Sequence, residues 1–148
     1  MMEEEIISPE EELKRADHLI FVSLKYTRTC DIMKNAIKRM ISAFELGMFE
    51  FLESLRKAKK IPEVPGTIKE RAVMVKDILG NPVKKYIILY NLLKKIDKAE
   101  YTAIEEFRKN VTLKTKDAKS IEVKVDNLYD YLDRTRDFVN LIKSRIKK

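Results

Sequence analysis

The side chains that most often carry out catalysis are scarce in this chain. Its 148 residues include one histidine, His18, and one cysteine, Cys30. The usual zinc and di-iron sites need several His, Cys or Glu-x-x-His ligands, which one such chain cannot supply. A nucleophile with a basic partner would have to use His18, which is better explained as a structural or surface histidine beside an apolar run. We therefore expect no metal and no cofactor, and we favour a protein without enzymatic activity.

Acidic side chains offer one other route to chemistry. Four aspartates recur at helical spacing near the end of the chain: Asp126, Asp130, Asp133 and Asp137. Such a stripe can present oxygen ligands to a divalent cation. Arg134 and Arg136 stand three or four positions from these carboxylates, a spacing that forms ion pairs along a helix. We favour a solvated ion-pair face over a Mg²⁺-dependent site.

Basic residues and tyrosines occur together in the later part of the chain. The net charge is +7, and all of the surplus lies beyond Pro62. Aromatic rings interleaved with cations can stack on bases and neutralise phosphates. The candidate binding residues are Lys84, Lys85, Tyr86, Tyr90, Arg108, Lys114 and Lys124. The alternative is a lysine-rich solvated surface, with the tyrosines at the rim of the core.

Composition places the chain among ordinary intracellular proteins. Abundant Lys and Glu, with no Trp and no Gln, are typical of thermophilic, archaeal-like sequences. A lone cysteine cannot form an intramolecular disulfide and suits a reducing cytoplasm. No apolar run approaches the roughly 20 residues that span a bilayer. We expect a cytoplasmic protein without a membrane segment.

The N-terminal part of the chain is typical of two long helices. Ser8-Pro9 is a strong helix start, and apolar residues recur every three or four positions from there to Lys60. Weak helix formers with capping side chains over 27–31 predict a break, so that a second helix spans Cys30–Lys60. The apolar run His18–Val22 predicts a first helix that is buried on more than one side.

The rest of the chain changes its periodicity several times. Prolines and a glycine exclude helix over 61–66. One helix is expected from Thr67 to Leu79, ended by Gly80, and another begins at Asn81. A further helix is expected to carry Tyr101, Ile104, Phe107 and Arg108, either separately or as a bent continuation. Alternating β-branched residues then predict a hairpin, and Asp126 is expected to cap a last helix.

These elements predict a mainly α fold. We expect an antiparallel helical bundle of five to six helices with a long N-terminal helix pair. A short β-hairpin is expected near residues 111–125. A chain of this length fits one domain over 1–148, in which we expect residues 1–7 to be flexible.

The helix order resembles the HEPN group of helical bundles, in which a long antiparallel helix pair packs against further helices, often in a dimer. Active members carry an Arg followed four to six residues later by His, which cleaves RNA. Here Asn140, not His, lies four residues after Arg136, and Arg15 precedes His18 by only three residues. The motif is absent, so the resemblance implies a catalytically silent member that binds a partner or a nucleotide.

Two functions from different classes follow. The leading hypothesis is a non-catalytic module that self-associates, with a homodimer as the default, or docks a protein partner. The alternative is a protein that binds nucleic acid or nucleotides through its basic later part.

Overall fold

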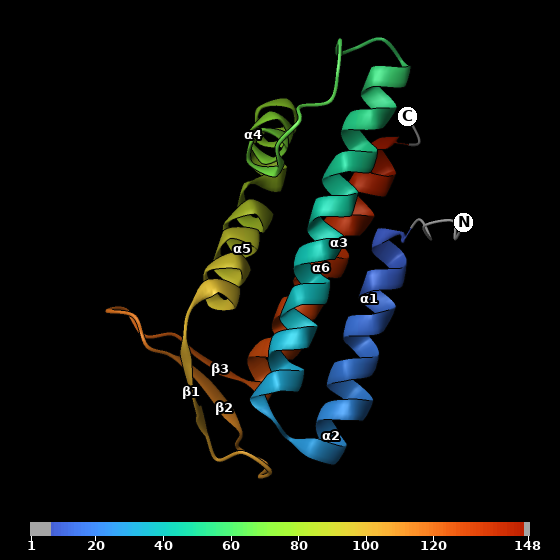
Figure 1. Cartoon of the computed structure of the whole chain (residues 1–148). Coiled ribbons are helices and arrows are strands. Elements are labelled where there is room, and N and C mark those ends of the chain that lie inside the picture. Colours follow the sequence, from blue (N-terminus) through green and yellow to red (C-terminus); the bar gives the residue numbers. More distant parts are fainter. Residues whose placement is uncertain (1–6, 147–148) are drawn as a thin grey trace, which may run out of the picture.

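A computed structural model describes residues 7–146 (Figure 1). The expected flexibility of residues 1–7 falls on residues that, apart from Ile7, lie outside this range. The elements follow in the order α1 (Pro9–His18), η1 (Leu19–Ser23), α2 (Leu24–Thr27), α3 (Cys30–Lys57), α4 (Ile68–Leu79), α5 (Asn81–Lys98), β1 (Tyr101–Ile104), β2 (Thr112–Thr115), β3 (Glu122–Lys124) and α6 (Val125–Ile146). Since α1, η1 and α2 form one continuous rod, the described residues form five helices and one small sheet. The predicted mainly α bundle is confirmed.

The helix α3 lies at the centre of the bundle. It packs against α1 and α6 on one side and against α4 and α5 on the other (Figure 1). It contributes more buried residues than any other described helix. The apolar stripe predicted for this helix therefore forms the middle of the core.

The helices around α3 do not all run in the same direction. Figure 1 shows α1 and α5 antiparallel to α3, as expected, whereas α6 runs parallel to it. Gly47 of α3 lies beside Phe138 of α6, whose ring atom is 3.4 Å from the place of a Cβ. Further along both helices, Lys143 Nζ donates a hydrogen bond of 2.8 Å to Glu50 Oε1. α5 brings the chain back to the end of the bundle where α3 begins, and the sheet leads from there into α6. For this reason α3 and α6 run parallel.

The predicted break between the first two helices is confirmed. Arg28 ends α2 in the left-handed conformation, with φ 51°, and Thr29 is extended. The Thr29 hydroxyl accepts a hydrogen bond of 3.4 Å from Ile32 N and caps α3. The second helix ends at Lys57, three residues before the predicted Lys60.

A π-helical turn, η1, interrupts the N-terminal rod. From Glu12 onward, the buried residues of the rod are spaced by four: Glu12, Ala16, Ile20 and Leu24. In an α-helix each step of four residues turns the stripe by about 40° away from its first position. The wider turn of η1 offsets this drift, so that Ile20 and Leu24 stay inside.

The expectation that His18–Val22 would be buried on more than one side is wrong. His18, Phe21 and Val22 are exposed, and Ile20 alone is buried in η1. The π turn explains this, because it directs one narrow stripe to the core and leaves the flanking positions outside.

The C-terminus of α3 is closed by its own backbone. Lys60 N donates to Leu55 O at 2.9 Å, and Lys59 N donates to Arg56 O at 2.9 Å. These two bonds form a Schellman motif, which places Lys59 at the position usually taken by glycine. Lys59 accordingly has φ 61°.

The helices after the linker begin and end as predicted. Thr67 Oγ1 accepts a hydrogen bond of 3.2 Å from Glu70 N at the start of α4. Gly80, with φ 68°, separates α4 from α5. No regular secondary structure occurs over residues 58–67, in agreement with the predicted extended linker.

The helix expected around Tyr101–Arg108 is wrong in both of its forms. α5 ends at Lys98, Ala99 is extended, and β1 follows. β1 pairs with β2 in the register Tyr101↔Thr115. Tyr, Thr and Ile suit a pleated surface, and the pairing covers an edge of β2 that a helix would leave open.

The predicted hairpin is confirmed, with β1 as an additional strand. The sheet is antiparallel in the order β1-β2-β3, with Leu113 opposite Val123. Both side chains are fully buried against the helices.

The expected cap at Asp126 is wrong, because α6 already begins at Val125. Asn127 Oδ1 instead accepts a hydrogen bond of 2.8 Å from Lys124 N.

We predict that Lys59→Gly stabilises the protein by about 1 kcal/mol, because glycine avoids the cost of a side chain in the left-handed conformation. Chemical denaturation measures the gain in the free energy of unfolding. Lys60→Gly is the matched control, since Lys60 has no positive φ, and it should give no gain. Equal effects of the two substitutions would contradict the assignment of Lys59 to the left-handed position of the Schellman motif.

Candidate nucleic-acid interface

The sheet is anchored at the N-terminus of α3. Glu106, in the β1–β2 connection, accepts a hydrogen bond of 2.9 Å from Cys30 N through Oε2. Cys30 Sγ donates to the carbonyl oxygen of Thr112 at 3.4 Å. The Tyr101 hydroxyl donates to Asp31 Oδ1 at 2.9 Å. A carboxylate at a helix N-terminus satisfies a free N–H and is favoured by the helix dipole. These bonds hold the β1–β2 connection against the bundle.

This anchoring perturbs two titratable groups. Burial, followed by the nearby charge of Glu106, raises the pKa of the Cys30 thiol from 9.0 to about 11. Burial and the bond to Asp31 raise the pKa of Tyr101 to about 12. Both groups are therefore neutral at physiological pH, and Cys30 is a poor nucleophile.

The β1–β2 connection is bonded to the end of the N-terminal rod. Phe107 N donates to Arg28 O at 2.8 Å. Phe107 and Arg28 have φ values of 67° and 51°, and neighbouring Glu105 has 52°. Non-glycine residues in this region cost energy and gather at functional sites. The Phe107 side chain nevertheless gains little burial, because it is 75% exposed.

A second aromatic ring is presented by the π turn. Phe21 of η1 stacks on Tyr129 of α6, with ring centroids 4.9 Å apart and planes 8° from parallel. Tyr129 is half-buried, whereas Phe21 remains 39% exposed. Tyr129 thus supports the Phe21 ring and leaves part of it accessible to a ligand.

Cations surround the base of this stack. Arg28, Lys109, Lys124 and Tyr129 all line one surface hollow of about 260 Å³. Within residues 7–146, none of the three cations forms an ion pair, although Asp126 also lines the hollow. Figure 1 shows that α2, the β1–β2 connection and the start of α6 lie at the same end of the bundle. We call Phe21, Arg28, Phe107, Lys109, Lys124 and Tyr129 the aromatic–basic end.

Two of the seven candidate residues from the sequence lie at or beside this end. Lys124 belongs to it, and Arg108 is exposed between Phe107 and Lys109. Lys114 is half-buried on β2, opposite Glu122.

The other four candidates lie on α5. Lys84 and Lys85 are exposed, and Lys85 Nζ is 5.1 Å from the centre of the Tyr86 ring. The Tyr90 hydroxyl donates to Glu45 Oε2 at 2.7 Å. Burial and this bond raise the pKa of Tyr90 well above its usual value. The structure therefore distributes the seven residues over separate places instead of one site.

Sequence reasoning did not identify Phe21, Arg28, Phe107 and Lys109 as binding residues. Phe21 was assigned to the core because it belongs to an apolar run. Four-residue spacing of Ala16, Ile20 and Leu24 was the one signal that Phe21 lies off the buried stripe.

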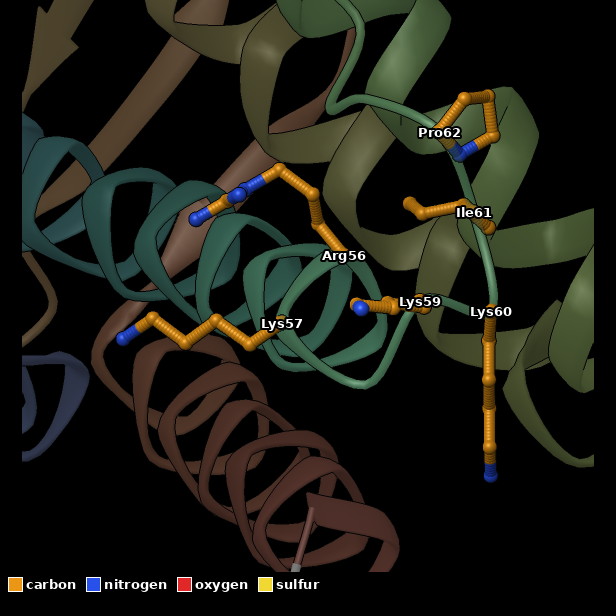
Figure 2. Close-up of a pocket in the computed structure, with 6 residues that line it drawn as sticks. All are labelled: Arg56, Lys57, Lys59, Lys60, Ile61 and Pro62. Atoms are coloured by element: carbon orange, nitrogen blue, oxygen red, sulfur yellow. The ribbon is translucent and has the colours of Figure 1, made fainter.

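Another hollow, with a volume of about 710 Å³, lies at the C-terminus of α3 and is lined by Arg56, Lys57, Lys59, Lys60, Ile61 and Pro62. Figure 2 shows that the Arg56, Lys57 and Lys60 side chains point in different directions. Arg56 is already paired with Glu53. The Schellman motif explains the shape of this segment, and its cations do not converge on one ligand position.

Two of the four aspartates in the stripe, Asp130 and Asp133, form ion pairs, in line with the favoured interpretation. Arg134 Nη1 lies 3.2 Å from Asp130 Oδ2. Arg136 contacts Asp133 at 3.4 Å and Asp17 of α1 at 2.9 Å. Among residues 7–146, no group of three or more His, Cys, Asp or Glu side chains is arranged to hold a metal ion.

The described helices contain no segment that is both long and apolar enough to cross a membrane.

We predict that the stability of the folded protein decreases between pH 9 and pH 11 through Cys30. In this range the unfolded chain has lost the thiol proton while the folded protein retains it, so rising pH favours unfolding. Denaturation of the native protein and of Cys30→Ser, whose hydroxyl does not titrate, measures this effect. As pH rises, the free energy of unfolding of the native protein should decrease more than that of Cys30→Ser. Parallel pH profiles would show that Cys30 makes no contribution.

Comparison with known proteins identifies no relative of this chain. No protein-family model matches this chain, and neither a curated protein nor a solved structure matches it. The resemblance to HEPN bundles stays a prediction from helix order, and the functional argument depends on the residues themselves.

Proposed function

We propose that this protein is a non-catalytic binding module whose aromatic–basic end binds single-stranded nucleic acid. The observation that carries the proposal is two exposed rings at a hollow with three cations that form no ion pair among the described residues. Phe21 stacks on Tyr129 of the hollow, and Phe107 N bonds to Arg28 O of the hollow. Base stacking on aromatic rings contributes about 1–3 kcal/mol per base, and cations neutralise the phosphates between bases.

The local backbone supports a binding role for both rings. The π turn holds Phe21 on Tyr129, and the bond between Phe107 and Arg28 fixes the β1–β2 connection. Such a fixed platform loses little conformational freedom when a ligand binds. Among the residues that line the hollow, Asn110 and Tyr129 are the uncharged side chains with both a donor and an acceptor for a base edge. We therefore expect weak discrimination between bases.

We predict that a fluorescent oligouridylate of about 12 nucleotides binds at about 50 mM salt and dissociates as salt is raised. Phe21→Ala and Phe107→Ala should each weaken binding by roughly 5–150-fold, because each removes a stacking surface. Lys124→Ala should reduce the slope of log affinity against log salt by about 0.7. Fluorescence anisotropy measures all three effects.

Phe49→Ala is the matched control for Phe21→Ala, because Phe49 is 38% exposed on the central helix, away from the aromatic–basic end. Lys60→Ala serves the same purpose for Lys124→Ala. Both controls should bind like the native protein. Absence of binding at low salt, or equal losses in the controls and the site variants, would overturn the proposal.

A further inference from the structure

A second surface differs from the aromatic–basic end in both shape and chemistry. It is a groove of about 480 Å³ between α4 and α5. Lys69 and Lys76 line it from α4, and Lys94, Lys95 and Lys98 line it from α5. No acidic side chain lines the groove. The arrangement therefore concentrates positive charge along both of its walls.

Most of this charge has no counterpart within the described part of the chain. Lys94 Nζ is 4.0 Å from Glu45 Oε2, so its charge is partly compensated. The other four lysines make no ion pair among residues 7–146. Lys95 and Lys98 also line an adjoining hollow, where Lys116 lies together with the acidic Glu100 and Asp117. An anionic ligand along α5 would meet this series of lysines.

The floor of the groove is apolar. Val73 is 53% exposed and lies there with Ile87. The one aromatic residue of the lining, Tyr90, is 2% exposed, and its hydroxyl is bonded to Glu45. No ring face is thus open for a base, and nucleic acid would leave the apolar floor without a partner. An amphipathic helix with acidic flanks would cover the floor and meet the lysines on both walls.

We propose that the groove between α4 and α5 docks an acidic amphipathic helix of a protein partner. Charge complementarity selects this occupant. Lys69 and Lys76 are seven residues apart, which is about 10 Å along α4. A docked helix lying along α4 presents its own acidic residues at the same seven-residue spacing. The apolar residues of the docked helix contact Val73 and Ile87. The partner therefore carries a helix of two or more turns with one apolar stripe between two acidic ones.

The probe for this proposal is a labelled synthetic peptide of about 18 residues, long enough to form a helix. It carries leucines along one helical stripe and glutamates on both flanks. The full chain should bind it with an affinity that decreases with salt. A peptide with Gln in place of Glu should bind at least about tenfold more weakly. No binding at a protein concentration of about 100 µM would overturn the proposal.

Charge reversal locates the binding surface. Lys69→Glu combined with Lys98→Glu should weaken binding of the acidic peptide at least about tenfold, and a peptide with Lys on its flanks should then bind. Lys84→Glu with Lys85→Glu is the matched control, because both lysines are exposed on α5 outside the groove lining. Equal losses in the two double variants would reject the groove. Val73→Asp tests the apolar floor, and it should also weaken binding of the acidic peptide.

The two binding surfaces can be tested independently. Phe21→Ala should leave peptide binding unchanged, and the Lys69/Lys98 variant should leave stacking on Phe21 and Phe107 unchanged. Displacement of the peptide by oligouridylate would show that the groove binds nucleic acid and would overturn the proposed protein partner.

Discussion

The backbone N–H groups at the start of α3 need hydrogen-bond partners, and the way they are satisfied organises the molecule. Thr29 caps Ile32, and Glu106 bonds to Cys30 N from a connection 76 residues away in the sequence. The same connection also bonds to the end of the N-terminal rod through Phe107 N and Arg28 O. Without Glu106 as the partner of Cys30 N, the β1–β2 connection would lose one of its anchors and depend more on the bond between Phe107 N and Arg28 O.

The two proposed surfaces use charge differently. At the aromatic–basic end, cations lie beside rings that can stack, which suits a flexible chain with a charged backbone and flat bases. Between α4 and α5, lysines flank an apolar floor, which suits a helix. A net charge of +7 alone does not separate these cases. The type of side chain between the cations decides which partner binds favourably to each surface.

Local signals in the sequence predicted local structure well. Ser8, Thr67 and Gly80 were assigned to helix ends, and each depends on neighbours within a few positions. Non-local effects were missed. Tyr101–Ile104 follows a helical pattern and becomes a strand because β2 offers an edge, with paired residues 8 to 14 positions apart (Ile104↔Thr112 to Tyr101↔Thr115). Phe21 looked like a core residue because it belongs to an apolar run, and the four-residue spacing of the buried stripe was the one local sign that it lies outside. The candidate site was scattered because only tertiary contacts decide which lysines converge.

The parallel arrangement of α3 and α6 has a consequence for how the chain folds. In a bundle of consecutive antiparallel helices, each helix meets its neighbour soon after it forms. Here the contact between Glu50 and Lys143 closes a loop of 93 residues that contains two helices and the whole sheet. Such distant pairing raises the average sequence separation of contacts, which slows folding relative to a simple helical bundle. The chain pays loop-closure entropy before α6 covers the core. In kinetic terms, this helical protein resembles mixed α/β domains.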